Sequence, residues 1–88
     1  MIEREITVTN KLGIHARPAS LIVKAAQQFS STITIIKDDV TADAKSIMNV
    51  MMLVAAKDTK ILLKADGPDE QKAFDTIAEM FARNFDED

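Results

Sequence analysis

His15 is the only histidine of the chain, and it lies in the segment with the most chemical information, residues 13–20. Apolar residues recur with helical spacing from Ala16 onward, so His15 falls at or beside the N-cap of a predicted helix. Backbone N–H groups in a first turn, such as that of Ala16, lack intrahelical acceptors and attract anions. Arg17 adds a planar fork of donors that suits phosphate oxygens. The segment therefore predicts a histidine that accepts a phosphoryl group held by Ala16 and Arg17, although the spacing also fits a histidine that only caps a helix.

Ser46 begins the second informative segment, where it can cap a short helix predicted over residues 47–53. Six of the seven residues after it are apolar, which is more than one side of a short helix can bury. Val50 and Leu53 are predicted to be core residues. We expect some of the remaining side chains to reach the surface and form an adaptable docking patch: Ile47, Met48, Met51 and Met52. The alternative is that the methionines fill gaps in the core and that Ser46 is only a cap, not a modification site.

The rest of the chain supplies the elements that must position these two segments. Alternating and β-branched runs predict strands over residues 2–9, 32–36, 40–43 and 60–66. A first helix is predicted over residues 16–29, with Pro18 in its first turn, and a last helix starts at residues 67–70 with an apolar stripe that extends to Phe85. The order β-α-β-β-α-β-α predicts an α+β open-faced β-sandwich, in which a four-stranded, largely antiparallel sheet has three helices on one face.

Length and composition exclude several classes of protein. With 88 residues, 47% hydrophobic and 28% charged, the chain is predicted to form one domain, residues 1–88. Zero cysteines and one histidine exclude disulfides, thiolate zinc sites and cysteine nucleophiles, so we expect no metal and no cofactor. Because no apolar run could span a bilayer and the first residues lack a secretory signal pattern, we expect a cytoplasmic monomer without membrane insertion.

Charge is distributed unevenly along the sequence. The formal net charge of −3 argues against nucleic acid as a partner. Residues 6–37 contain four cations and no acid, whereas residues 38–88 contain twelve acids and six cations. Because a local positive field speeds encounter with negative partners, we expect a small anion or an acidic protein face to approach near His15, unless the segregation is accidental.

The sequence resembles the HPr family, the histidine-containing phosphocarriers of the bacterial phosphoenolpyruvate-dependent sugar phosphotransferase system. The resemblance covers nearly the whole chain and rests on Gly13-Ile14-His15-Ala16-Arg17-Pro18-Ala19, on Lys45-Ser46-Ile47-Met48 followed by Val50-Met51, and on Asp66-Gly67. It implies that an enzyme I, drawing on phosphoenolpyruvate, phosphorylates His15 on its Nδ1 atom. His15 would then donate the group to a histidine on the IIA component of a transporter in sugar uptake. Arg17 would steady the phosphoryl group, and the protein would be a carrier, not by itself a multiple-turnover enzyme.

The resemblance also implies a docking surface and a route of regulation. Both partners would use one surface formed by two helices: Ser20, Lys24, Ile47, Met48 and Met51. In some bacteria a dedicated serine kinase/phosphorylase modifies the serine that matches Ser46. A dianion at that helix start would oppose the docking of acidic partners.

Three alternatives stay open at this point. A related carrier of the nitrogen branch of the system shares the His15 pattern, so sugar uptake is not assured. A regulatory binding module would use the state of Ser46 to select a transcriptional regulator or an enzyme, and a plain interaction domain would be favoured if His15 were buried. Asn49 and Asp58 stand where many relatives have glycine. Because both residue types tolerate left-handed backbone, these departures bear on partner preference and not on the fold.

Overall fold

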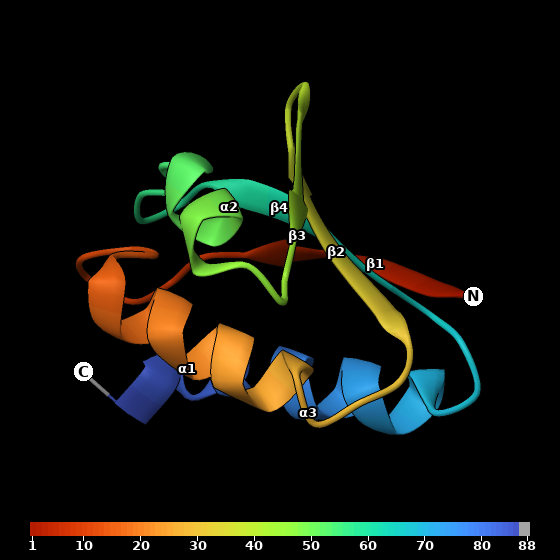
Figure 1. The fold of residues 1–88 in the computed structure, drawn as a ribbon. Coiled ribbons are helices and arrows are strands. Elements are labelled where there is room, and N and C mark those ends of the chain that lie inside the picture. The colour runs from red at the N-terminus through yellow and green to blue at the C-terminus, as the bar shows by residue number, and fades with distance from the viewer. Residues whose placement is uncertain (87–88) are drawn as a thin grey trace.

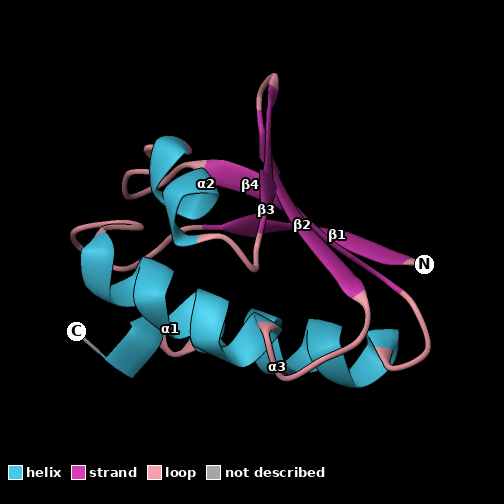
Figure 2. Ribbon diagram, in the orientation of Figure 1, coloured by secondary structure: helices cyan, strands magenta, loops and turns pink. Residues whose placement is uncertain are grey.

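A computed structural model describes residues 1–86 and places the chain in two layers, a sheet and a layer of helices (Figure 1). The strands are β1 (Ile2–Thr7), β2 (Thr32–Lys37), β3 (Val40–Asp43) and β4 (Lys60–Asp66), and the helices are α1 (Ala16–Ala26), α2 (Ile47–Met52) and α3 (Glu70–Ala82). The strands pair in the order β1-β4-β2-β3, and every pair is antiparallel. Figure 2 shows α1 and α3 lying below the sheet while α2 lies beside its end. The predicted fold class and element order are confirmed.

The core lies between the sheet and the helices. Alternate residues of the central strands are buried, as period-two spacing requires: Ile33, Ile35, Ile61, Leu63 and Ala65. They meet the apolar stripes of the two long helices, which include Ile22, Phe74 and Ile77. In the described part of the chain, the other face of the sheet carries no helix (Figure 2). It presents polar pairs such as Glu3 and Lys64, whose carboxylate and ammonium lie 4.0 Å apart.

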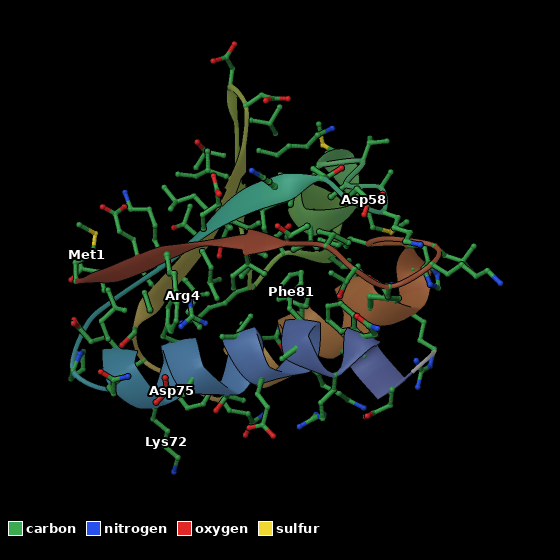
Figure 3. The ribbon with its side chains drawn as sticks, turned by 180° about the vertical axis from the view of Figure 1, so that it is seen from behind. Met1, Arg4, Asp58, Lys72, Asp75 and Phe81 are labelled. Carbon is green, nitrogen blue, oxygen red and sulfur yellow. The ribbon has the colours of Figure 1, made fainter. Side chains whose placement is uncertain are left out.

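Arg4 interrupts the alternation of β1, and the structure gives the reason. Its guanidinium carbon lies 5.1 Å from the centroid of the Phe74 ring, so the side chain of Arg4 reaches from β1 to α3 (Figure 3). A guanidinium over an aromatic face is attracted by the ring quadrupole and keeps its charged head near water. The position that breaks the pattern in sequence is therefore a helix contact and not a defect in the strand.

The prediction that the first helix extends to residue 29 is wrong, because α1 ends at Ala26. The amides of Gln28 and Phe29 bond to carbonyls three residues back, which tightens the last turn. Beyond it, the Asp69 carboxylate accepts hydrogen bonds from the backbone N–H groups of Ser30 and Ser31, each at 2.9 Å. This contact with the start of α3 directs the chain away from the helix axis.

The C-terminal prediction is also corrected. The spacing predicts that Phe85 belongs to the stripe of the last helix, but α3 ends at Ala82 and residues 84–86 form a left-handed turn, with φ values of 53°, 55° and 60°. Phe85 is nevertheless buried, and its ring meets that of Phe81 edge-on at a centroid distance of 4.9 Å. The last helix, predicted to start at residues 67–70, starts at Glu70 with Asp69 as its N-cap, so Pro68 lies before the helix.

Within residues 1–86, no helix is both long and apolar enough to cross a membrane.

Candidate functional site

His15 is the N-cap residue of α1, with extended backbone angles of φ −107° and ψ −166°. Its carbonyl accepts the first hydrogen bond of the helix, from the Ala19 N–H at 2.9 Å. Pro18 has no N–H, so the amides that precede this bond at the helix start are those of Ala16 and Arg17. His15 is half-buried, and its side chain makes no capping hydrogen bond to the first turn of α1. The geometry therefore disfavours both a histidine that only caps and a histidine inside the core.

The loop before His15 is held from both sides. Gly13 has φ +68°, and a Cβ there would lie 2.3 Å from the Ala55 carbonyl oxygen, so only glycine fits. That carbonyl accepts a hydrogen bond from the Ile14 N–H at 2.8 Å, and Ile14 itself is buried. The side-chain amide of Asn10 donates to the Gly13 carbonyl at 2.7 Å and closes the turn. The position of the imidazole is thus set by backbone contacts with the segment that follows α2.

Arg17 reaches from the exposed side of α1 to the C-terminal turn. Its Nη1 donates to the Phe85 carbonyl at 3.1 Å. A second hydrogen bond connects the C-terminal turn to the loop before His15, because the Thr9 hydroxyl donates to the Asn84 side-chain carbonyl. The sequence did not predict the roles of Thr9, Asn84 and the Phe85 carbonyl. No motif marks a backbone acceptor in a left-handed turn, so local sequence contains no signal for them.

Ser46 caps α2 as predicted. Its hydroxyl accepts hydrogen bonds from the backbone N–H of Asn49 at 3.3 Å and from the Asn49 side-chain amide at 3.1 Å. The Asn49 side-chain carbonyl in turn accepts from the Asp43 N–H at 3.3 Å. Asn49 therefore links the cap to β3, which a glycine at this position could not do. Asp58 has φ +73° and turns the chain, in agreement with its predicted place.

The predicted docking residues are all exposed. Ser20 and Lys24 lie on the outer side of α1, and Ile47, Met48 and Met51 are 43%, 71% and 43% exposed on α2. Val50 and Leu53 are buried, as predicted. Met52, which was considered for the same patch, is 67% exposed.

Helix α2 lies alongside α1 because hydrogen bonds near both of its ends connect it to the two ends of α1. The Gln27 side chain at the C-cap of α1 donates to the Lys45 carbonyl at 3.3 Å, next to the start of α2. At the other end, the Ile14–Ala55 hydrogen bond joins the residue before His15 to the chain beyond α2. The later residues of α2 are therefore those nearest to His15.

Elsewhere, Asp69 and Glu70 form a second polar cluster. Hydrogen bonds from the Ser31 hydroxyl, and then from backbone N–H groups, hold the pKa of the Asp69 carboxyl below its usual range. The Gly67 N–H and the N-terminal ammonium lower the pKa of Glu70, and this contact raises the pKa of the ammonium of Met1. This cluster lies where α3 begins, at the opposite end of the molecule from the start of α1 (Figure 1), where His15 is the N-cap residue. Its role is to join loops and not to do chemistry at the histidine.

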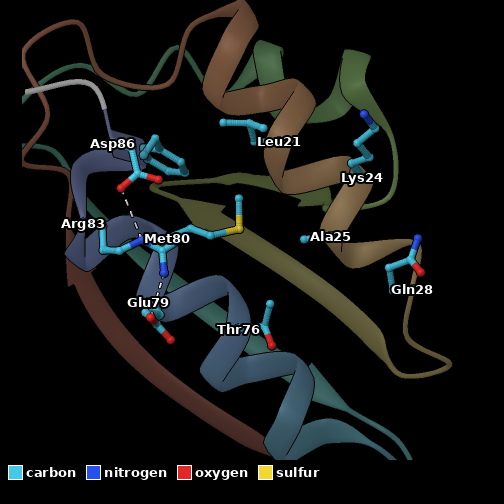
Figure 4. Close-up of a pocket in the computed structure, with 10 residues that line it drawn as sticks. Leu21, Lys24, Ala25, Gln28, Thr76, Glu79, Met80, Arg83 and Asp86 are labelled. Carbon is cyan, nitrogen blue, oxygen red and sulfur yellow. Dashed lines mark hydrogen bonds and ion pairs between the residues drawn. The ribbon is translucent and has the colours of Figure 1, made fainter.

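A groove of about 500 Å³ runs between α1 and α3, lined by Leu21, Ala25 and Met80 among others (Figure 4). Neither His15 nor Arg17 borders it. Among the described residues, no three His, Cys, Asp or Glu side chains come together as metal ligands.

An open β-sandwich with a part-exposed histidine and an arginine at the start of its first helix defines a class of small phosphocarrier proteins. The family described as the PTS HPr component phosphorylation site matches residues 2–83, and the chain belongs to this family.

Known proteins agree with this assignment. The phosphocarrier protein HPr of Treponema pallidum is 41% identical over 88 residues, the full length of both chains. The crystal structure of HPr from Thermoanaerobacter tengcongensis superimposes with a TM-score of 0.96 at 40% identity, covering 100% of this chain and 99% of that one. The phosphocarrier protein NPr of Escherichia coli is 36% identical and covers 99% of this chain and 98% of its own.

Proposed function

We propose that the protein accepts a phosphoryl group on His15 from phosphorylated enzyme I, with phosphoenolpyruvate as the source, and passes it to a IIA component in sugar uptake. The observation that supports this most directly is the position of His15 at the N-cap of α1, beside the amides of Ala16 and Arg17. A helix start is an anion site because its N–H groups point outward and share the positive end of the helix dipole. A dianionic phosphoryl group attached to the ring would be held there without a metal ion.

The transfer exchanges one phosphorus–nitrogen bond for another. The lone pair of Nδ1 on neutral His15 attacks the phosphorus held by the histidine of enzyme I, and that histidine leaves with the electron pair of the broken bond. The guanidinium of Arg17 binds equatorial oxygens of the group as it moves. Because the phosphoramidate is labile, the reverse type of attack by a IIA histidine removes the group. No cofactor takes part, and the protein is consumed and regenerated as a carrier.

The docking surface consists of the exposed residues beside this site. Both partners would contact the outer side of α1 and the apolar residues of α2: Ser20, Lys24, Ile47, Met48 and Met51. The flexible apolar side chains adapt to two different partners, and the cation of Lys24 favours an acidic face. In this proposal the protein works in the cytoplasm as a monomer, with residues 1–88 as a single domain.

Radioactive phosphoenolpyruvate and enzyme I test the proposal. The native protein is expected to take up one acid-labile phosphate and to lose it when a IIA component is added. His15→Ala is expected to take up none, while Lys72→Ala, which removes an exposed cation on α3, is expected to react as the native protein does. Absence of uptake by the native protein would contradict the proposal.

Two observations favour other assignments within the same family. The likeness to NPr favours a carrier of the nitrogen branch, which is tested by comparing rates of phosphoryl uptake from the enzyme I of each branch. The place of Ser46 at the start of α2, where an added phosphate would face the first N–H groups of the helix, favours a regulatory module controlled by a serine kinase/phosphorylase and read by a transcriptional regulator. A pull-down that compares the native protein with Ser46→Asp tests this, and identical partners for both would exclude it.

A further inference from the structure

Three of the exposed residues of α2 are methionines. Met48, Met51 and Met52 are three of the five methionines of the chain, and they are 71%, 43% and 67% exposed. We call these three residues the methionine cluster. The helix buries only Val50, so the core does not cover the methionine side chains. Oxidants attack methionine in proportion to its exposure, and the product changes a flexible apolar side chain into a polar one.

The cluster flanks the histidine. Since the Ile14–Ala55 hydrogen bond joins the residue before His15 to the chain just beyond α2, Met51 and Met52 occupy the end of α2 nearest the site. A change of polarity at the cluster therefore alters the surface on which a partner must rest while its histidine faces His15.

We propose that the methionine cluster is a reversible oxidation site that switches docking off when peroxide rises. This inference rests on the proposed function, because docking of enzyme I and IIA at α2 is part of it. The sulfur lone pair attacks one oxygen of hydrogen peroxide, the O–O bond breaks, a sulfoxide forms and water leaves, so that sulfur loses two electrons and the peroxide gains them. A dithiol reductant, acting through a methionine sulfoxide reductase, returns the thioether, and the products are a disulfide and water.

The chain contains its own controls. Met1 is 64% exposed, but its ammonium lies 2.9 Å from Glu70 at the opposite end of the molecule. Met80 packs against the core in the groove between α1 and α3 (Figure 4). Peroxide is therefore expected to oxidise Met1, Met48 and Met52 first, Met51 next and Met80 last. Only oxidation of the cluster is expected to affect transfer.

The experiment treats the full-length protein with graded hydrogen peroxide and follows each methionine by peptide mass spectrometry. In parallel, the rate of phosphoryl uptake from phosphorylated enzyme I is measured against carrier concentration. Oxidation of the cluster is expected to raise the KM for the carrier about tenfold, as expected when apolar contacts are replaced by buried polar groups, with kcat within about twofold. Treatment with the reductase and a dithiol is expected to restore the KM.

The matched variant carries Met48→Leu, Met51→Leu and Met52→Leu together. Leucine is apolar, similar in volume and a good helix former, so the variant keeps its fold. Its KM is expected to be unchanged by peroxide, while Met80→Leu is expected to respond as the native protein does. Equal loss of affinity in the triple variant, a native KM unchanged after the cluster is oxidised, or oxidation of Met80 before the cluster would overturn the inference. Absence of uptake by the untreated protein would instead refute the proposed function and the effect of oxidation on docking. Peptide mass spectrometry would still decide whether the methionine cluster is an oxidation site.

Discussion

Arg17, two residues beyond the histidine, donates a hydrogen bond from Nη1 to the backbone carbonyl of Phe85 at 3.1 Å. The contact joins the start of α1 to a residue 68 positions further along the chain and fixes where the guanidinium rests. Because a carbonyl is a weaker acceptor than a phosphoryl dianion, the guanidinium can leave the Phe85 carbonyl when His15 is phosphorylated. The C-terminal turn thus holds the cation near the site.

Removing the guanidinium is expected to slow transfer more than it weakens the fold. Arg17→Ala should lower the rate of phosphoryl uptake by about 100- to 1,000-fold, the range found when one donor to a developing anion is lost. The free energy of unfolding should change by only about 1 kcal/mol, since the side chain is exposed. The kinetics of phosphoryl uptake measure the effect on transfer, and urea unfolding measures the effect on stability. Equal transfer rates for Arg17→Ala and the control Lys72→Ala would contradict the role of Arg17.

Gly13 and Gly67 provide a matched pair for testing the loop before His15. A Cβ at Gly13 would meet the Ala55 carbonyl at 2.3 Å, and one at Gly67 would meet the Ser31 hydroxyl at 2.6 Å. Both alanine variants are expected to lose about 2 kcal/mol or more of unfolding free energy, measured by urea titration. Only Gly13→Ala should also slow phosphoryl uptake at a temperature where both variants remain folded. Equal slowing in the two variants would show that the loop geometry has no specific effect.

The local sequence pattern was sufficient to predict most helices and strands and the position of His15 at a helix start. Period-two spacing in β4 and the stripe of α1 are consequences of one-sided burial, so composition and spacing reveal them directly. The placement of His15 at a helix start follows in the same way, because the stripe begins at Ala16. The exposure of Met48 and Met52 was also predictable, since a six-residue helix cannot bury apolar residues on every side.

What the sequence could not reveal depends on partners distant in the chain. Phe29 continues the helical spacing of α1, yet the helix stops earlier because Asp69 binds the next two amides. Phe85 continues the spacing of α3, yet it is buried from a left-handed turn. Spacing reports that a side chain is buried, but the backbone conformation that buries it is decided by tertiary contacts. The Arg17–Phe85 contact belongs to this second group.

Asp69 is expected to make the stability of the fold fall in acid. Hydrogen bonds from the Ser31 hydroxyl and from backbone amides depress its pKa in the folded state. The stabilisation is therefore fully present above the ordinary aspartate pKa of about 4 and is lost as the pH falls through the lower, folded-state value. Between pH 7 and about pH 3, the urea midpoint of the native protein should drop more than that of Asp69→Asn, which lacks the carboxylate at every pH. Asp39→Asn, at the exposed hairpin turn, should follow the native curve, and parallel curves for all three proteins would contradict the assignment.

Ser46 separates the effect of a cap from the effect of a charge. Ser46→Ala removes the acceptor that binds both amide groups of Asn49, so it should cost about 1 kcal/mol of unfolding free energy and leave phosphoryl uptake nearly unchanged. Ser46→Asp keeps an acceptor of equal capping strength and adds a negative charge beside the docking residues of α2. Its stability should stay within about 0.5 kcal/mol of the native value, while the KM for uptake from enzyme I should rise about tenfold through like-charge repulsion. Urea unfolding and uptake kinetics on both variants decide the matter. If Ser46→Asp docks as well as the native protein, charge at this helix start does not control the partners.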